Sequence, residues 1–141
     1  MNRRQAREEA FIILFQHKFR ENMDELLEDF HSAHNDIGEQ KSYIHQICER
    51  FIEAREKIDA AIEKYSENWK KDRISMVSLA VLRLAICEML YFHDIPVVVS
   101  IAEALEIGKK FEGEEAIPFI NGILEGYRAE IESEKSEVED T

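Results

Sequence analysis

The sequence predicts a single all-α domain, and three observations indicate that fold class. Apolar residues recur every three or four positions along most of the 141-residue chain, which is the spacing of one helix face. No segment alternates apolar and polar residues between turn signals, as a half-buried strand would. Only five glycines and two prolines occur, and the 45% hydrophobic content is enough for a compact core without disulfides or metals.

The first half of the chain contains helical segments separated by short polar stretches. The first helix is predicted over 3–19 and a second, strongly acidic one over 23–33. After a turn at 35–38, apolar residues recur over 42–65, which indicates either one long amphipathic helix or two shorter ones. Residues 66–73 are polar and include the only tryptophan, so we expect a connection there.

A long apolar segment after this connection predicts a central helix over 76–92. Its only polar residues are Ser78, Arg83 and Glu88, which point in different directions at about 100° per residue. A helix that is apolar nearly all round packs against neighbours on several sides. Ser75 can cap its first turn, and a buried Arg83 requires a carboxylate or carbonyl partner, so we expect a structural ion pair.

Two more helices follow, and an acidic tail ends the chain. The Asp-Ile-Pro sequence at 94–96 breaks the central helix, and the next helix is predicted over 98–111, with Gly113 ending it at positive φ. Pro118 suits the first turn of a last helix, which ends near residue 131. The helical domain therefore spans 1–131, and 132–141 is expected to be a disordered acidic tail.

Charge is distributed unevenly along the chain. The formal net charge of −12 argues against an extended nucleic-acid surface, because phosphate binding depends on clustered lysine and arginine. Residues 1–20, however, contain five basic and two acidic residues, whereas 21–40 contain seven acidic residues and no lysine or arginine. The charge pattern therefore predicts one place near the N-terminus that attracts RNA and a body that repels it.

The first predicted helix carries a stripe of basic and aromatic residues. Arg4, Arg7, Phe11, Phe15 and Lys18 fall within an arc of about 80°. The neighbouring arc is the candidate core face and consists of Ala6, Ala10, Ile13, Leu14 and His17. Because arginine neutralises phosphates and aromatic rings stack on unpaired bases, the stripe favours single-stranded RNA binding. Alternatively, Phe11 and Phe15 belong to the core and the basic residues are merely solvated.

Other residue patterns do not indicate catalysis, a metal, a cofactor or a membrane. Cys48 and Cys87 lie in apolar helical patterns, as expected for buried thiols of a protein in the reducing cytoplasm. His31 and His34 lie three residues apart, which could place two metal ligands on one helix face. The sequence shows no third ligand, so no metal site is predicted. We find no nucleophile or phosphate-loop motif and expect no enzymatic activity. The apolar run at 74–92 is interrupted by charged residues and is too short to span a membrane.

Four segments, in order, resemble the NusB family of transcription antitermination proteins. They are Arg-Arg-x-Ala-Arg-Glu-x-Ala at 3–10 leading to Leu-Phe-Gln at 14–16, VLRLAICEML at 81–90, DIPVVVSIAEALEIGKKF at 94–111 and FINGIL at 119–124. The resemblance implies about seven helices in two small bundles. It also implies binding to the boxA element of ribosomal RNA leaders together with NusE, a small-subunit ribosomal protein. Such complexes help RNA polymerase read through terminators.

The resemblance also implies which residues contact RNA. The arginine-rich N-terminus of the family corresponds to Arg3, Arg4 and Arg7. A family aromatic on the RNA surface corresponds to Phe119, and an acidic position that tunes RNA affinity corresponds to Glu115. Together with Phe15 and Lys18 of the stripe, these residues form the predicted RNA-binding site.

A separate surface is predicted to bind the partner protein. Apolar surface around Ser78 and Leu79, near the start of the central helix, is expected to dock a NusE-like protein. The alternative hypothesis is a helical protein-interaction module of the same fold that has lost RNA binding. Changing Arg4 and Arg7 to glutamate is predicted to abolish RNA binding without unfolding the domain. The interaction module is favoured instead if the partner binds equally well with and without boxA RNA and no RNA binds, alone or in the complex.

Overall fold

The computed structural model describes residues 1–66 and 74–139, and this part of the chain contains six α-helices and no strand. The helices are α1 (Arg3–His17), α2 (Met23–Ala33), α3 (Lys41–Tyr65), α4 (Met76–Tyr91), α5 (Val97–Phe111) and α6 (Ile117–Glu139). Two single-turn 3-10 helices, η1 (Gly38–Gln40) and η3 (Glu114–Ala116), precede α3 and α6. The all-α prediction is confirmed, and the count is close to the expected seven. The predicted connection at 66–73 lies, beyond residue 66, outside the described residues.

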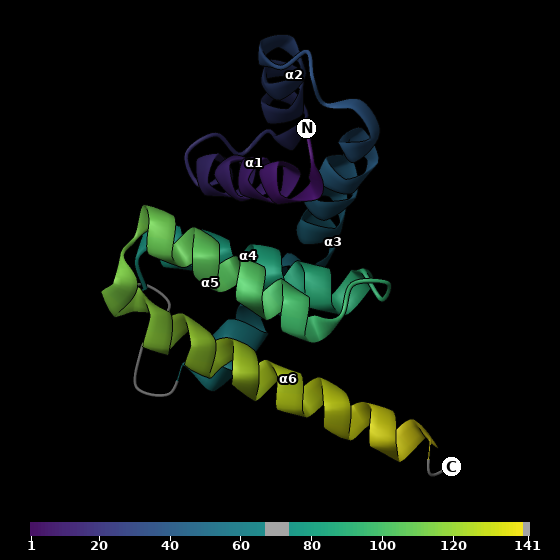
Figure 1. Ribbon diagram of the computed structural model, residues 1–141, viewed down its shortest axis with the longest axis vertical. Coiled ribbons are helices and arrows are strands. Elements are labelled where there is room, and N and C mark those ends of the chain that lie inside the picture. The colour runs from purple at the N-terminus through teal and green to yellow at the C-terminus, as the bar shows by residue number, and fades with distance from the viewer. Residues whose placement is uncertain (67–73, 140–141) are drawn as a thin grey trace.

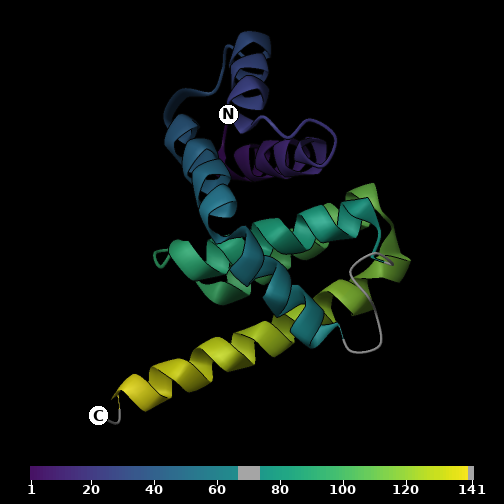
Figure 2. The same cartoon turned by 180° about the vertical axis from the view of Figure 1, so that it is seen from behind.

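The helices form two small bundles that share α3. One end of α3 lies beside α1 and α2, and the other end lies beside α4 and α6 (Figures 1 and 2). Apolar residues recur along its whole length, so the segment forms one helix of 25 residues rather than two. Helix α1 also packs across α4, so the two bundles have one continuous core.

Helix α4 lies at the centre of the molecule, as its sequence predicts. It contacts α1, α3, α5 and α6, and every residue from Ser78 to Met89 is buried. The Ser75 side chain caps the helix by accepting a hydrogen bond from the Ser78 amide at 3.0 Å. The expected structural ion pair is also present, because Arg83 donates two hydrogen bonds of 2.9 Å to the Asp59 carboxylate.

The C-terminal helix is longer than expected. Helix α6 continues to Glu139, so the prediction of a disordered tail is wrong for residues 132–139; residues 140 and 141 lie outside the described part. Glutamate and lysine are good helix formers, and Arg128 donates to Glu132 one turn later at 2.9 Å. Among the described residues, no helix is long and apolar enough to cross a membrane.

Candidate nucleic-acid interface

Helix α1 begins with a capping box, and two arginines follow in its first turn. The Asn2 side chain accepts from the Gln5 amide, and the Gln5 side chain accepts from the Asn2 amide, each at 2.8 Å. The first turn contains Arg3 and Arg4 and no acidic residue. Positive charge is unfavourable at the positive end of a helix dipole, so acceptors from other elements must stabilise these two guanidinium groups.

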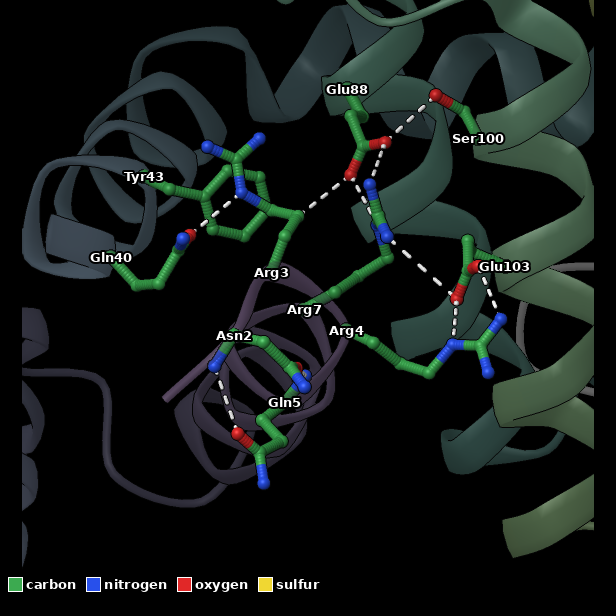
Figure 3. Close-up of polar contacts among 10 residues, drawn as sticks. All are labelled: Asn2, Arg3, Arg4, Gln5, Arg7, Gln40, Tyr43, Glu88, Ser100 and Glu103. Carbon is green, nitrogen blue, oxygen red and sulfur yellow. Dashed lines mark hydrogen bonds and ion pairs between the residues drawn. The ribbon is translucent and has the colours of Figure 1, made fainter. Parts of the chain in front are cut away.

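Arg7 is buried in a network that joins four helices (Figure 3). Only 5% of the residue is exposed, and it donates two hydrogen bonds of 2.9 Å to Glu88 of α4. Tyr43 of α3 donates to the same carboxylate at 2.7 Å, and Ser100 of α5 donates at 2.8 Å. Burial and the adjacent Glu88 raise the pKa of Tyr43, which therefore keeps the proton that it donates.

The prediction that Arg7 lies on an exposed RNA-binding stripe is therefore wrong. Its guanidinium is the charge partner of a buried carboxylate, and a glutamate at this position would face Glu88 in the core. An Arg7→Glu change would thus unfold the domain rather than test RNA binding.

Arg3 and Arg4 lie closer to solvent, and each is already partnered. The Arg3 Nε donates to the Gln40 side chain at 2.7 Å, and its guanidinium lies 4.2 Å from the centre of the Tyr43 ring. Arg4 has a side chain that is 74% exposed and donates to both oxygens of Glu103 on α5, at 3.1 and 2.9 Å. The hydrogen bond from Arg4 lowers the pKa of Glu103, so this carboxylate is charged at neutral pH.

A row of phenylalanines runs along α1 and past its end, from the core to the surface. Phe11 is buried and lies 5.0 Å, ring centre to ring centre, from Phe111 of α5. Phe15 is half-buried and lies 5.7 Å from Phe19, which is 62% exposed. Phe11 is therefore a core residue, Phe15 lies at the margin of the core, and Phe19 faces outward. Sequence reasoning did not select Phe19 or the exposed Phe111, although the spacing of Phe11, Phe15 and Phe19 places all three on one helix face.

Two lysines accompany these aromatic rings. Lys18, directly after α1, is exposed and forms no ion pair within residues 1–66 and 74–139. Lys110 of α5 binds Glu8 of α1 at 2.7 Å and lies 5.3 Å from the centre of the Phe111 ring. We call the surface formed by Arg4, Phe15, Lys18, Phe19 and Phe111 the α1 face.

Phe119 and Glu115 lie where α5 turns into α6. Phe119 is half-buried and packs against the core in the first turn of α6, and Glu115 is exposed in η3. Gly113 has φ of 128°, as expected for the residue that ends the preceding helix. At Gly108 a Cβ would lie 2.8 Å from the Cδ1 of Ile120, so the missing side chain lets α6 approach α5 closely.

The predicted partner surface is not exposed. Ser78 and Leu79 are both buried, so the prediction that they dock a partner protein is wrong. Their positions follow from the central place of α4, which is buried on all sides from Ser78 to Met89. The exposed apolar residue at this end of α4 is Met76, at 43%.

His31 and His34, which lie three residues apart in the sequence, bond to different partners. His31 pairs with His45 of α3, with 2.6 Å between their Nε2 atoms, whereas the Nδ1 of His34 donates to the Phe30 carbonyl at 2.9 Å. The described part of the chain contains no group of three histidine, cysteine or acidic side chains that could hold a metal ion. Cys48 and Cys87 are buried and free, and burial raises the pKa of each thiol to about 12.

The fold and the α1 face together define a class, the small all-helical protein of two bundles with one basic and aromatic face. Within that class the chain belongs to the NusB family, whose model matches residues 4–128. It is 46% identical over 134 residues to the transcription antitermination protein NusB of Natranaerobius thermophilus, covering 89% of this chain and 93% of that one. Identity to the Bacillus subtilis protein of the same name is 38%, over 94% of this chain and 98% of the relative.

Solved structures of the family have the same fold. NusB from T. maritima superposes with a TM-score of 0.80 at 36% identity, over 89% of each chain. A chain of the crystal structure of the antitermination factors NusB and NusE in complex with dsRNA gives a TM-score of 0.80 at 27% identity, over 92% of this chain and 99% of that one.

Proposed function

We propose that this chain is a transcription antitermination factor that binds RNA together with a NusE-like protein. Its relatives bear that functional name, and one structural neighbour is a complex of NusB, NusE and dsRNA. The RNA is of boxA type, a single-stranded element of ribosomal RNA leaders, and the complex acts on RNA polymerase during elongation and termination. The protein does this in the cytoplasm, as a binding adaptor and not as an enzyme.

The α1 face is the proposed RNA contact. Arg4 and Lys18 are exposed cations on one side of α1 and can each bind a phosphate. Phe15 and Phe19 lie beside Lys18 and offer ring surface on which unpaired bases can stack. Arg3 is partly exposed and donates to Gln40 through its Nε, and it contributes from the margin of this face. Combining exposed cations with exposed rings in one place is the observation that carries the proposal.

Phe119 and Glu115 extend the proposed RNA surface toward the start of α6. The half-buried Phe119 ring offers an edge to a base, whereas the exposed Glu115 carboxylate repels phosphate and thereby limits affinity. Arg7 is not part of the contact, but its bond to Glu88 keeps the first turns of α1 in place.

A protein partner supplies the affinity that this acidic chain lacks. With a net charge of −12, the molecule repels RNA everywhere except near the α1 face, so binding by the protein alone is weak and sensitive to salt. When NusE holds the same RNA, the second contact becomes intramolecular and its effective concentration rises. We place the NusE contact near the exposed Met76 at the start of α4, in place of Ser78 and Leu79.

A titration of labelled boxA-type RNA, with and without NusE, tests this function. The Arg4→Glu and Lys18→Glu double variant should bind at least about tenfold more weakly at fixed salt. The slope of log affinity against log salt should fall by about 1.4, since each phosphate contact on a single strand contributes roughly 0.7. Both residues are exposed, so the melting temperature should stay near that of the wild type.

The matched control is Arg50→Glu with Arg128→Glu, which makes the same change in net charge on α3 and α6. An equal loss of affinity in this control would contradict the α1 face as the binding site. If wild-type protein bound NusE but no RNA, alone or in the complex, the protein would instead be an interaction module that has lost RNA binding. Duplex RNA of the same sequence shows whether an unpaired strand is required.

A further inference from the structure

Glu103 occupies the position that an RNA phosphate would need in order to bind Arg4. Its carboxylate receives two parallel hydrogen bonds from Arg4, at 3.1 and 2.9 Å. A guanidinium binds carboxylate and phosphate oxygens with the same forked geometry. The two anions therefore compete for the same N–H groups of Arg4.

The exposure of the two side chains indicates which of them moves. Arg4 is 74% exposed and extends from the first turn of α1, whereas Glu103 is 16% exposed on α5. Glu103 also lies 3.7 Å from the Nη1 of Arg7, so it keeps a cationic neighbour when Arg4 leaves (Figure 3). When Arg4 leaves Glu103 to bind a phosphate, the Glu103 carboxylate is therefore not left without a cationic neighbour.

The charges around this pair cancel in the free protein. Arg4 and Arg7 contribute two positive charges, and Glu88 and Glu103 contribute two negative charges within the same set of contacts. This part of the molecule therefore attracts phosphate only weakly until the ion pair opens. Removing the charge of Glu103 would leave one uncompensated positive charge at the surface.

We propose that Glu103 is an affinity-setting residue that holds Arg4 in the free protein and yields it to an RNA phosphate. The inference rests on the RNA-binding function proposed above. Glu103 thereby lowers the affinity for RNA that arrives alone. RNA already held by the partner protein displaces it more readily, because tethering raises the local phosphate concentration. Because of this ion pair, Arg4 binds an RNA phosphate more readily in the complex with the partner protein than in the protein alone.

The test is the affinity of Glu103→Gln for labelled single-stranded boxA-type RNA. Without NusE we expect about two- to tenfold tighter binding, the range for losing an exposed ion pair and one repulsive charge. With NusE present the gain should be smaller. Glu53→Gln is the matched control, because it also removes one carboxylate that is paired with an arginine, Arg50 of α3. This control should leave affinity within about twofold of the wild type.

A double-mutant cycle shows whether Glu103 acts through Arg4. In an Arg4→Gln background, Glu103→Gln should raise affinity by less than about twofold, because the side chain that it releases is absent and only the loss of one repulsive charge remains. An equal gain in that background, or in Glu53→Gln, would overturn the proposal in favour of a general charge effect. Melting temperatures of all variants should agree within a few degrees.

Failure of this inference differs from failure of the proposed function. If Arg4→Gln weakens RNA binding but Glu103→Gln does not tighten it, the Glu103 proposal is overturned and the RNA-binding function stands. If wild-type protein and Glu103→Gln both fail to bind RNA, with and without NusE, both proposals fall.

Discussion

Three arginines within one and a half turns of the same helix have three different environments. Arg3 stacks on Tyr43, Arg4 pairs with Glu103 near solvent, and Arg7 is enclosed with Glu88. Each step of about 100° around α1 points the next side chain toward a different helix. At the residue scale, the environment of each arginine therefore depends on the acceptor that the fold brings to it more than on its being an arginine. Of the three, only Arg4 is well exposed.

His17 provides a second test at the residue scale, through the pH dependence of stability. The residue is buried at the end of α1, with its ring 5.7 Å from that of Phe51 in an edge-on contact. Burial, and after it the positive charge of Arg55, lowers the pKa of His17 from its ordinary value of 6.5. Between the folded and unfolded pKa values, the unfolded chain therefore binds more protons than the folded one.

The free energy of unfolding should consequently be highest above pH 6.5 and fall as the pH drops toward the folded pKa of His17. In His17→Gln this fall should be shallower, as measured by urea unfolding between about pH 7.5 and 5. Some slope should remain, because burial also lowers the pKa of His31. A profile identical to that of the wild type would show that His17 is not held neutral.

At the scale of elements, α6 shows how one position in a helix is restricted by its neighbour. Gly126 faces α3, and a Cβ there would lie 2.6 Å from the Cδ1 and 2.9 Å from the Cγ of Tyr65. The Tyr65 ring cannot simply rotate away, because its hydroxyl donates to Glu130 of α6 at 2.7 Å. Gly122, one turn earlier, meets no such restriction, because a Cβ there would have no atom within 4 Å.

Alanine at these two glycines should therefore have opposite effects. Gly126→Ala should lower the free energy of unfolding by about 1–3 kcal/mol, the usual cost of overpacking. Gly122→Ala should raise it by about 0.5–1 kcal/mol, because alanine loses less backbone entropy in a helix. Urea unfolding of both variants measures the difference. Equal stabilisation by both would mean that α3 and α6 are not in close contact at Gly126.

At the scale of the whole molecule, the two bundles are held together by α3 and by the network around Glu88. Arg7 comes from the first bundle, Tyr43 from the first half of α3, and Ser100 from the second bundle. All three donate to one carboxylate on the central helix. The bundles should therefore unfold together in one transition, as expected for a single domain of this size.

Removing Arg7 should test this connection. Arg7→Met leaves Glu88 buried without its cation, and breaking a buried pair in this way costs about 3–5 kcal/mol. The Arg7→Met and Glu88→Gln double variant also removes the negative charge of the Glu88 carboxylate. The glutamine amide oxygen can still accept a hydrogen bond from Tyr43 or Ser100. The double variant should be more stable than the single one by urea unfolding. Equal stability would contradict a charged network at the centre of the molecule.

The sequence by itself determined the features that depend on neighbours along the chain. Helix 23–33, the Ser75 cap, the core arc of α1 and the central place of α4 are all confirmed. Each follows from periodicity or capping within a few turns, where the interacting groups are close in sequence. The segments at 81–90 and 94–111 likewise sufficed to indicate the family.

Only the tertiary structure decided which predicted site residues are accessible. Arg7 and Arg4 share one stripe of α1, but the acceptor of Arg7 lies 81 positions along the chain and that of Arg4 lies 99 positions away. Ser78 and Leu79 are likewise buried because α4 is surrounded by helices from both ends of the chain. Periodicity defines the face of a helix on which a residue lies. Whether that face meets water or another helix depends on long-range packing, which has no local signal in the sequence.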